Sequence, residues 1–481
     1  MIFSRCLRIF PSCVAALVFL AALMSFAGCA VAPLPEHPDQ LHYPTLDFQL
    51  PEVETLVLDN GIRLYLKEDN ELPLVQMTAM IGSGGVTTPA DRVGFAGLFG
   101  SVWRTGGAGD RTPEELDIHL DYLAADLGAS MGPYTAQLDL SMRSEDLEQG
   151  VAVLGDLLRR PKFASERLEL ARLQAQEHVR RQNDSPGATS RRLLLAALYP
   201  HHYLGYSPTQ ETLAAITRQD LTDFHQTYFA PNNLWIAVSG DFDRENLLRI
   251  LEADFGDWAR REVPEQQLPP VTQSDSGSIH VAAKELPQTT IMIGDLGLTK
   301  DHPDQYAVRV LNYILGGGGF NSRMMREIRS NRGLAYSAYS YFQVGRRLPG
   351  PFIAGTETKN VSVAPAISLT REIMEDLRDN PVTDEELQLA KESQINSFVF
   401  GFENTHSVVN RQMTMAFFDY PKDYLAGYRD RIAAVTAVDV QRVAREFINL
   451  SRQQIVLVGN AEEFGSALEQ FGLPLVEVNL D

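Results

Sequence analysis

The sequence predicts an α+β protein made of two homologous repeats, each an antiparallel sheet packed with helices. Three observations support this class: an internal repeat with a constant spacing, strand patterns at the start of each repeat, and long amphipathic helical patterns after them. Strands and helices do not alternate regularly, which disfavours a parallel, doubly wound sheet. A chain of 481 residues, 44% of them hydrophobic, is long enough to build two such units.

The repeat keeps one constant offset, 219 in residue number, at two separate places in the chain. The run LAAIT at 213–217 returns as IAAVT at 432–436, and an aspartate follows each run, Asp220 and Asp439. The same offset aligns residues 166–172 with 385–391. Because separated segments share one offset, we infer the duplication of a whole structural unit rather than of one helix.

The first repeat begins with strand patterns. We expect a hairpin over Thr55–Leu66 that turns at Asp59-Asn60-Gly61, followed by a strand over Val75–Ile81. Leucines at 116, 120, 123 and 127 recur at helical spacing, so they predict an amphipathic helix over Pro113–Leu127.

Helices and one strand close each repeat. Helices are expected to begin near Ser165 and near Thr383, where Thr383 and Glu386 form a capping-box signature. Alternating patterns over Leu234–Val238 and Ile455–Val458 predict the closing strands.

The chain is acidic, with 62 acidic and 42 basic residues and a formal net charge of −20. Two of the basic residues, Arg5 and Arg8, lie within positions 1–28, where no acidic residue occurs. The remaining surface therefore repels nucleic acid and anionic lipid headgroups, and we expect no nucleic-acid partner.

The N-terminus has the anatomy of a secretory signal peptide. A basic start precedes the apolar run Val14–Phe26, which is too short to span a bilayer. The run ends in Phe26-Ala27-Gly28-Cys29, which resembles a bacterial lipobox with Cys29 as the lipidated residue. Ala30 resembles the signal for outer-membrane sorting, so we expect a lipid anchor at the periplasmic face of the outer membrane. Cleavage after Ala32 is the competing prediction, which Pro33 disfavours.

Cysteine usage excludes a disulfide framework. Of the three cysteines, Cys6 and Cys13 are expected to leave with the signal and Cys29 to be lipidated, so we expect no thiolate metal ligand in the mature chain. The predicted organisation is a signal peptide at 1–28, a tether at 29–47, a first unit at 48–258, a linker rich in Pro, Gln and Ser at 259–278, and a second unit at 279–481.

The most informative stretch lies in the second repeat, where LGGGGFNSR at 315–323 is followed by RSNRGLAYS at 329–337. It resembles the second-half signature of the pitrilysin/insulinase family of zinc metallopeptidases, the inverzincins. The resemblance extends over about residues 48–465. It implies a two-repeat peptidase fold, with peptidase-like units at 48–258 and 279–481.

The resemblance also implies roles for two residues. In the family an Arg of this segment holds the substrate backbone and a Tyr donates a hydrogen bond to the developing oxyanion. The matching positions are Arg329 and Tyr336, with Arg332 as an alternative for the arginine. Arg323 and Arg326 are expected to serve structure or surface.

The first repeat lacks the metal site that the resemblance would require. Family members carry H-x-x-E-H on a helix, where two His bind zinc and the Glu acts as general base. The matching stretch here is GFAGLFGS at 94–101, so Gly97 and Ser101 replace the ligands and Gly100 replaces the base. The family's third ligand position falls at His178, with Glu177 beside it, and one such residue cannot hold a metal alone.

This combination resembles the non-catalytic subunit of a heterodimeric peptidase. It implies a homologous partner that carries H-x-x-E-H and zinc, a peptide or small-protein substrate, and no cofactor or activity in this chain alone. The mitochondrial processing peptidase has a similar division. Two alternatives remain: a pseudopeptidase that serves as a binding or assembly module at the outer membrane, and a self-sufficient peptidase with a rearranged metal site.

Overall fold

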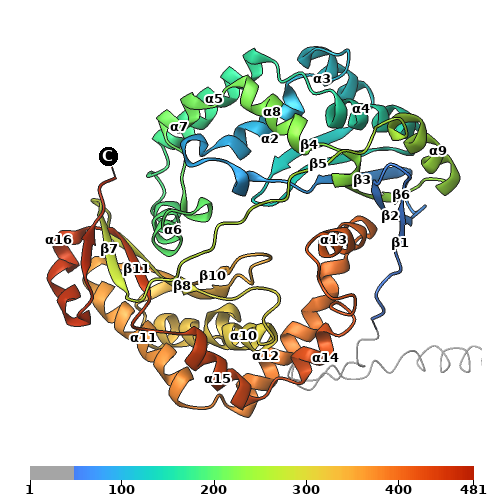
Figure 1. The fold of residues 1–481 in the computed structure, drawn as a ribbon. Coiled ribbons are helices and arrows are strands. Elements are labelled where there is room, and N and C mark those ends of the chain that lie inside the picture. Colours follow the sequence, from blue (N-terminus) through green and yellow to red (C-terminus); the bar gives the residue numbers. More distant parts are fainter. Residues whose placement is uncertain (1–47, 481) are drawn as a thin grey trace, which may run out of the picture. The chain divides into compact units, whose positions relative to one another are not determined.

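Two six-stranded sheets, one in each half of the chain, organise the structure (Figure 1). The computed structural model describes residues 48–480, so the predicted signal peptide, the tether and Cys29 lie outside the described residues. Residues 50–481 form one unit that contains both sheets. Among the described helices, none has the length and apolar character needed to cross a membrane.

The first sheet has the strand order β1-β2-β6-β3-β5-β4. Its strands are β1 (Glu54–Val57), β2 (Arg63–Glu68), β3 (Leu74–Ile81), β4 (Asp126–Met131), β5 (Ala136–Arg143) and β6 (Leu234–Gly240). The α-helices of this half are α2 (Phe95–Thr105), α3 (Pro113–Tyr122), α4 (Leu147–Arg159), α5 (Ser165–Arg180), α6 (Pro186–Leu198), α7 (Gln210–Ala215), α8 (Arg218–Tyr228) and α9 (Arg244–Phe255).

The second sheet has the order β12-β7-β11-β8-β10-β9, which repeats the first except at the outer strand: β12 is the last strand of the chain and pairs parallel with β7, whereas β1 is the first strand and pairs antiparallel with β2. Its strands are β7 (Ser278–Ala283), β8 (Gln288–Leu296), β9 (Ala335–Phe342), β10 (Pro351–Lys359), β11 (Gln454–Gly459) and β12 (Leu475–Glu477). The α-helices are α10 (Gln305–Asn312), α11 (Val363–Asp379), α12 (Asp384–Ser397), α13 (Thr405–Phe417), α14 (Tyr428–Ala433), α15 (Ala437–Phe447) and α16 (Ala461–Phe464). Residues 259–277, between the halves, form no helix or strand.

The internal repeat is confirmed helix by helix. The pairs α5 and α12, α6 and α13, and α8 and α15 begin at positions that differ by the offset of the sequence repeat. Capping boxes explain part of the repeated sequence: Thr217 and Asp220 cap α8 as Thr436 and Asp439 cap α15. The predicted box of Thr383 and Glu386 is present at the start of α12.

The predicted hairpin is also confirmed, since β1 pairs antiparallel with β2 from Glu54 opposite Leu66 to Val57 opposite Arg63. The helix predicted over Pro113–Leu127 is wrong at its end. Helix α3 ends at Tyr122 because Ala124 adopts a left-handed φ of +48°. Leu127 instead lies in β4, where it is buried on the same core as the helix, so the leucine spacing continued across two elements.

The sheets are mixed rather than purely antiparallel. β6 pairs parallel with β2 and antiparallel with β3, and β11 pairs parallel with β7 and antiparallel with β8. The reason is the connection: the closing strand of each half returns to the middle of its sheet after a series of helices, and such long crossovers permit parallel pairing.

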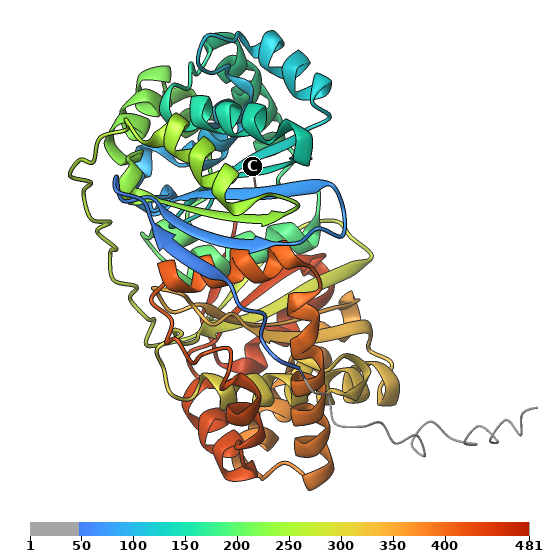
Figure 2. The same cartoon turned by 90° about the vertical axis from the view of Figure 1, so that its right-hand side faces the viewer.

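The two halves exchange one helix each. One face of the first sheet packs on helices of its own half, whereas α13 of the second half covers the other face (Figures 1 and 2). There Val409 and Met413 pack with Met80 of β3 and Ala237 of β6. In the same way α6 of the first half packs through Leu194 on the second sheet.

This exchange explains the burial of the closing strands. β6 and β11 were expected to alternate, but β11 is buried at every residue and β6 at all but two. A strand covered on both faces is apolar on both, as in sheets with helices on each side.

Candidate functional site

The glycine-rich segment follows an irregular helical path that ends in β9. α10 continues as a π-helical turn, η7 (Tyr313–Gly317), and a second π-helical stretch, η9 (Met325–Asn331), precedes the strand. Such turns are rare and frequently occur at functional sites. Gly316 permits close approach to β9, because a Cβ on it would lie 2.3 Å from the backbone nitrogen of Ser340. Gly319 adopts a φ of +57°, which favours glycine.

Arg329 and Tyr336 lie side by side at the end of this path. The guanidinium carbon of Arg329 is 4.5 Å from the ring centroid of Tyr336 and 4.7 Å from that of Phe320. The two aromatic residues are 82% and 70% exposed, respectively. Among the residues that the structure describes, neither the Arg329 guanidinium nor the Tyr336 hydroxyl has a hydrogen-bond or ion-pair partner. The stack therefore presents two unsatisfied donors to solvent.

The strand that carries Tyr336 is an edge strand. β9 lies at the end of the second sheet and, among the described strands, pairs only with β10. Its outer backbone groups are open to a further strand, which is how many proteins bind extended peptides. Arg332, the alternative arginine, is exposed at the end of η9 and has no ring contact within the described part of the chain.

In the first half, helix α2 carries the three positions of the missing zinc motif. Gly97 and Ser101 lie on its exposed face, whereas Gly100 is buried. A Cβ on Gly100 would lie 3.3 Å from the Cα of Ser130 in β4, so a glutamate there would require the strand to move. Two glycines and one hydroxyl do not fit zinc, which needs three nitrogen, sulfur or carboxylate ligands from the protein.

The remaining ligand position lies on α5, which packs against α2. His178 is exposed there, and Glu177 pairs with Arg180 at 2.7 Å and with Arg181 at 2.6 Å. The hydrogen bond from Arg180 is the largest of the effects that lower the pKa of Glu177. Glu177 therefore forms ion pairs with two arginines at the C-terminal end of α5.

Similarity to known proteins supports the peptidase resemblance. Residues 215–394 match the family described as the peptidase M16 inactive domain. An uncharacterized zinc protease of Streptomyces coelicolor is 26% identical over 433 residues, covering 82% of this chain and 91% of that protein. A non-peptidase homolog of Helicobacter pylori is 23% identical, with the same coverage of 82% and 91%. The mitochondrial-processing peptidase subunit beta of Blastocladiella emersonii is 24% identical over 87% of this chain and 91% of its own.

The fold agrees with these matches. The crystal structure of a peptidase M16 inactive domain from Pseudomonas fluorescens superposes with a TM-score of 0.76 at 24% identity, covering 85% of this chain and 98% of that chain. The family match, the relatives and the fold therefore agree on the peptidase M16 family as the one that this chain resembles. The resemblance to the pitrilysin/insulinase peptidases is confirmed, and in this M16 homologue residues 215–394 match the inactive domain of the family.

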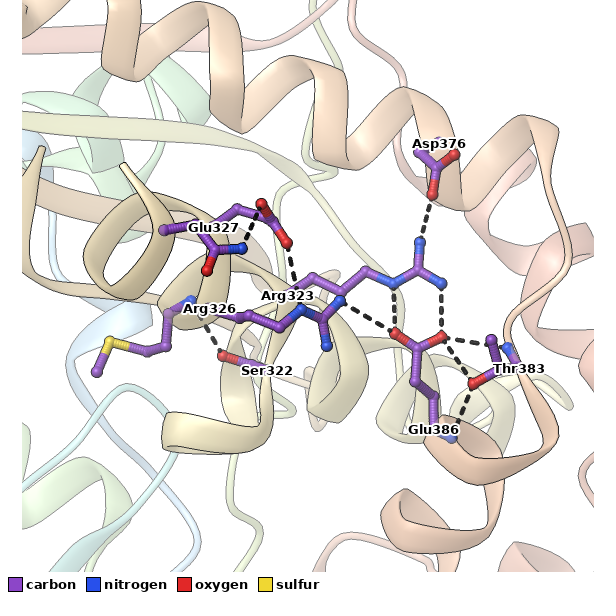
Figure 3. A network of polar contacts seen from close by, with 9 residues as sticks. Ser322, Arg323, Arg326, Glu327, Asp376, Thr383 and Glu386 are labelled. Atoms are coloured by element: carbon purple, nitrogen blue, oxygen red, sulfur yellow. Dashed lines mark hydrogen bonds and ion pairs between the residues drawn. The ribbon is translucent and has the colours of Figure 1, made fainter. Parts of the chain in front are cut away.

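A buried arginine anchors the site of the M16 homologue to the helices behind it (Figure 3). Arg323 donates to both carboxylate oxygens of Glu386, at 2.8 and 2.6 Å, and to Asp376 at 2.6 Å. Glu386 also accepts the backbone N–H of Thr383 in the capping box of α12. Burial by itself would raise the pKa of Glu386, but the hydrogen bonds from Arg323 and Thr383 lower it to about 2.

This network gives Arg323 the structural role that the sequence predicts. It ties the start of η9, which carries Arg329, to α11 and α12. Arg326 lies at the surface, 3.2 Å from Glu327 and 3.5 Å from Glu386. The position of the exposed stack therefore depends on a buried ion pair behind it.

One group of possible metal ligands lies elsewhere in the M16 homologue. Within residues 48–480, His302, Asp304 and Glu446 are the only three His, Cys, Asp or Glu side chains close enough to share an ion. Arg442 lies 2.5 Å from an oxygen of Asp304 and 3.8 Å from one of Glu446. Because the Arg442 guanidinium already pairs with both carboxylates, this group is a surface ion network.

Phe320 has no role that the sequence analysis predicts, yet its ring forms one side of the Arg329 stack. Its position directly after four glycines, in the segment that also carries Arg329, is the signal that could have identified it.

Proposed function

We propose that this M16 homologue is the non-catalytic subunit of a heterodimeric zinc metallopeptidase in the periplasm. It would contribute Arg329 and Tyr336 to a homologous subunit that carries H-x-x-E-H. One observation supports this most directly: within the described residues, the exposed Tyr336 hydroxyl on edge strand β9 and the adjacent Arg329 guanidinium on η9 have no partner, in a chain whose α2 has no zinc ligands.

The chemistry of the two donors suits peptide hydrolysis. Attack of water on a peptide carbonyl places negative charge on its oxygen, and the phenol O–H of Tyr336 is a suitable donor to that oxyanion. The Arg329 guanidinium can bind carbonyl oxygens of the same substrate, which lies extended along β9. The zinc of the partner would activate the attacking water.

The names of similar proteins support separate roles for a zinc-bearing subunit and a non-catalytic one. One relative is a zinc protease, another is a non-peptidase homolog, and a third is a subunit of a processing peptidase. The relatives therefore include one chain named as a non-peptidase and another named as a subunit of a peptidase, and the proposal combines these two features in one chain.

Reconstitution tests the proposal. The purified chain is mixed with an H-x-x-E-H homologue from the same organism, and hydrolysis of a quenched fluorescent peptide is followed. Tyr336→Phe keeps the ring but removes the donor, so kcat should fall by about 10²- to 10³-fold, as for the loss of an oxyanion donor. Tyr339→Phe on the same strand, outside the Arg329 stack, is the matched control and should retain activity. Full activity in Tyr336→Phe would refute the oxyanion role.

Two further measurements separate the alternatives. Stoichiometric zinc in the purified chain, with activity in the absence of any partner, would establish a self-sufficient peptidase. If a pull-down from membranes recovers no H-x-x-E-H protein, the heterodimer is wrong and a binding or assembly module is favoured.

We also propose that the chain is lipid-anchored through Cys29 on the periplasmic face of the outer membrane. The support is the lipobox-like sequence before Cys29 and the alanine after it. In fractionated cells the wild-type protein should enter the outer-membrane fraction, whereas Cys29→Ser should not carry the lipid by mass spectrometry. An unmodified N-terminus at Pro33 would instead identify cleavage after Ala32.

A further inference from the structure

A second candidate site lies in the C-terminal half, apart from Arg329 and Tyr336. A cavity of about 600 Å³ opens between α10, α12, α13 and α14; these helices are labelled in Figure 1. Its volume is in the range of small-molecule sites. The residues that matter for its chemistry are three arginines and three tyrosines: Arg309, Arg346, Arg411, Tyr420, Tyr424 and Tyr428.

The charge of this cavity is opposite to that of the chain. Of the described residues, three arginines line it and no aspartate or glutamate does, although acidic residues outnumber basic ones by 62 to 42 in the whole sequence. Within the described part of the chain, none of the three guanidinium groups has a carboxylate partner. The cavity therefore concentrates positive charge that the protein leaves uncompensated.

The arginines are held by packing rather than by acceptors. The Arg411 guanidinium carbon lies 4.7 Å from the ring centroid of Phe402, and that of Arg346 lies 4.7 Å from the ring centroid of Phe418. Gly401 permits the approach of Arg411, because a Cβ there would lie 2.4 Å from Nη1. The Nε of Arg309 is buried and donates to no acceptor among the described residues.

The buried Arg323 can be compared with the arginines of the cavity. That buried guanidinium is met by Glu386 and Asp376, which satisfy it fully enough to raise the pKa of the arginine despite its burial. At Arg411 burial has the opposite outcome and lowers the pKa of the guanidinium. Desolvated donors without acceptors are costly, and a bound anion would remove that cost.

We propose that this cavity binds an organic oxyanion, a carboxylate or phosphate group carried on an apolar or aromatic body. Guanidinium groups match the geometry of both oxyanions. The volume exceeds that of a bare ion, and tyrosine rings with the side-chain amides of Gln394 and Asn410 can contact the attached body. The proposal does not depend on the peptidase function.

Isothermal titration of the purified full chain at low ionic strength tests the site. The probes are the peptide acetyl-Ala-Ala-Phe with a free carboxylate, the same peptide as its C-terminal amide, phenyl phosphate, and inorganic phosphate. The carboxylate peptide or phenyl phosphate should bind at least about tenfold more tightly than the amide, because the charge-assisted hydrogen bonds are lost in the amide. Which of the two binds identifies the oxyanion.

Variants assign the binding to the cavity. Arg309→Gln combined with Arg411→Gln should weaken binding by about tenfold or more. Arg346→Gln, at an exposed loop, should weaken it by a smaller factor and serves if the double variant does not fold. Arg249→Gln removes a surface arginine of the first half and should leave binding unchanged. Equal affinity for acid and amide, binding of inorganic phosphate alone, or unchanged affinity in Arg346→Gln and the double variant would overturn the proposal.

Discussion

Replacement of Glu386 by glutamine should destabilise the protein, mainly through the loss of its buried ion pair with Arg323 and to a lesser extent of its longer one with Arg326. The side chains of Arg323 and Glu386 are 10% and 15% exposed, so the glutamine would leave a buried guanidinium with only the half-exposed Asp376 as a charged partner. The pKa of Glu386 falls from its ordinary value of 4.5 to about 2, which corresponds to about 3 kcal/mol in favour of the charged form. Because water still reaches the edge of the pair, we expect a loss of about 2 kcal/mol.

The loss should depend on pH with a defined sign. Since the folded pKa of Glu386 lies below the unfolded value, its stabilisation is complete near neutral pH, declines as pH falls through 4.5, and is lost as pH falls through 2. Glutamine has no such titration. The wild-type protein should therefore lose its advantage over Glu386→Gln on acidification, and most of the difference should be gone by about pH 3.

Urea unfolding at pH 7, 4.5 and 3, followed by far-UV circular dichroism, measures both effects. Glu385→Gln is the matched control, because Glu385 is exposed in the same first turn of α12 and has no salt bridge to any described residue. It should change stability by less than about 0.5 kcal/mol. The reasoning is refuted if Glu386→Gln costs as little as the control at pH 7, or if its deficit is the same at pH 3.

Three further predictions concern α2, a buried histidine and the exchanged helix. Gly97→Ala should raise the free energy of unfolding by about 0.5–1 kcal/mol, because alanine favours a helix more than glycine does and a Cβ at this exposed position meets nothing within 4 Å. A lower free energy of unfolding in urea would contradict this. Burial lowers the pKa of His225 to about 4, so the wild type should lose stability as pH falls from 6.5 towards 4, where only the unfolded state gains the proton. His225→Gln should flatten that slope, and a profile identical to wild type would exclude the histidine as its source. Met413→Ala should lower the free energy of unfolding by about 2–5 kcal/mol in the same assay, because Met413 is fully buried between the halves. The control Met413→Leu nearly keeps the side-chain volume and should lower it by less than about 1.5 kcal/mol. Equal losses of stability in the two variants would argue against a packing effect.

Local patterns predicted local structure well. The Asn60-Gly61 turn, the capping box at Thr383 and the repeated Thr217 and Thr436 caps depend only on near neighbours in the chain, so the sequence contains all that they need. The leucine spacing near Leu127 failed because one core face collects leucines from both α3 and β4. Periodicity records which face is buried and does not record where one element ends.

The features of the candidate site are likewise of two kinds: some can be predicted from the sequence, and others only from the fold. The loss of zinc ligands at Gly97, Gly100 and Ser101 is readable in the sequence, since ligand chemistry depends on residue type. The stack of Phe320 on Arg329 and the pair of Arg323 with Glu386 join residues from separate elements, so only the fold could bring them together.

The sequence by itself determined the family resemblance, the duplicated unit and the absence of a zinc motif, because each depends on residue type or spacing along one chain. Only the tertiary structure decided that the halves exchange α6 and α13, that β9 is an open edge beside Tyr336, and that three arginines surround one cavity. These features depend on which faces meet after folding. The apolar faces of the equivalent helices α6 and α13 do not indicate whether each helix packs on the sheet of its own half or on the sheet of the other half.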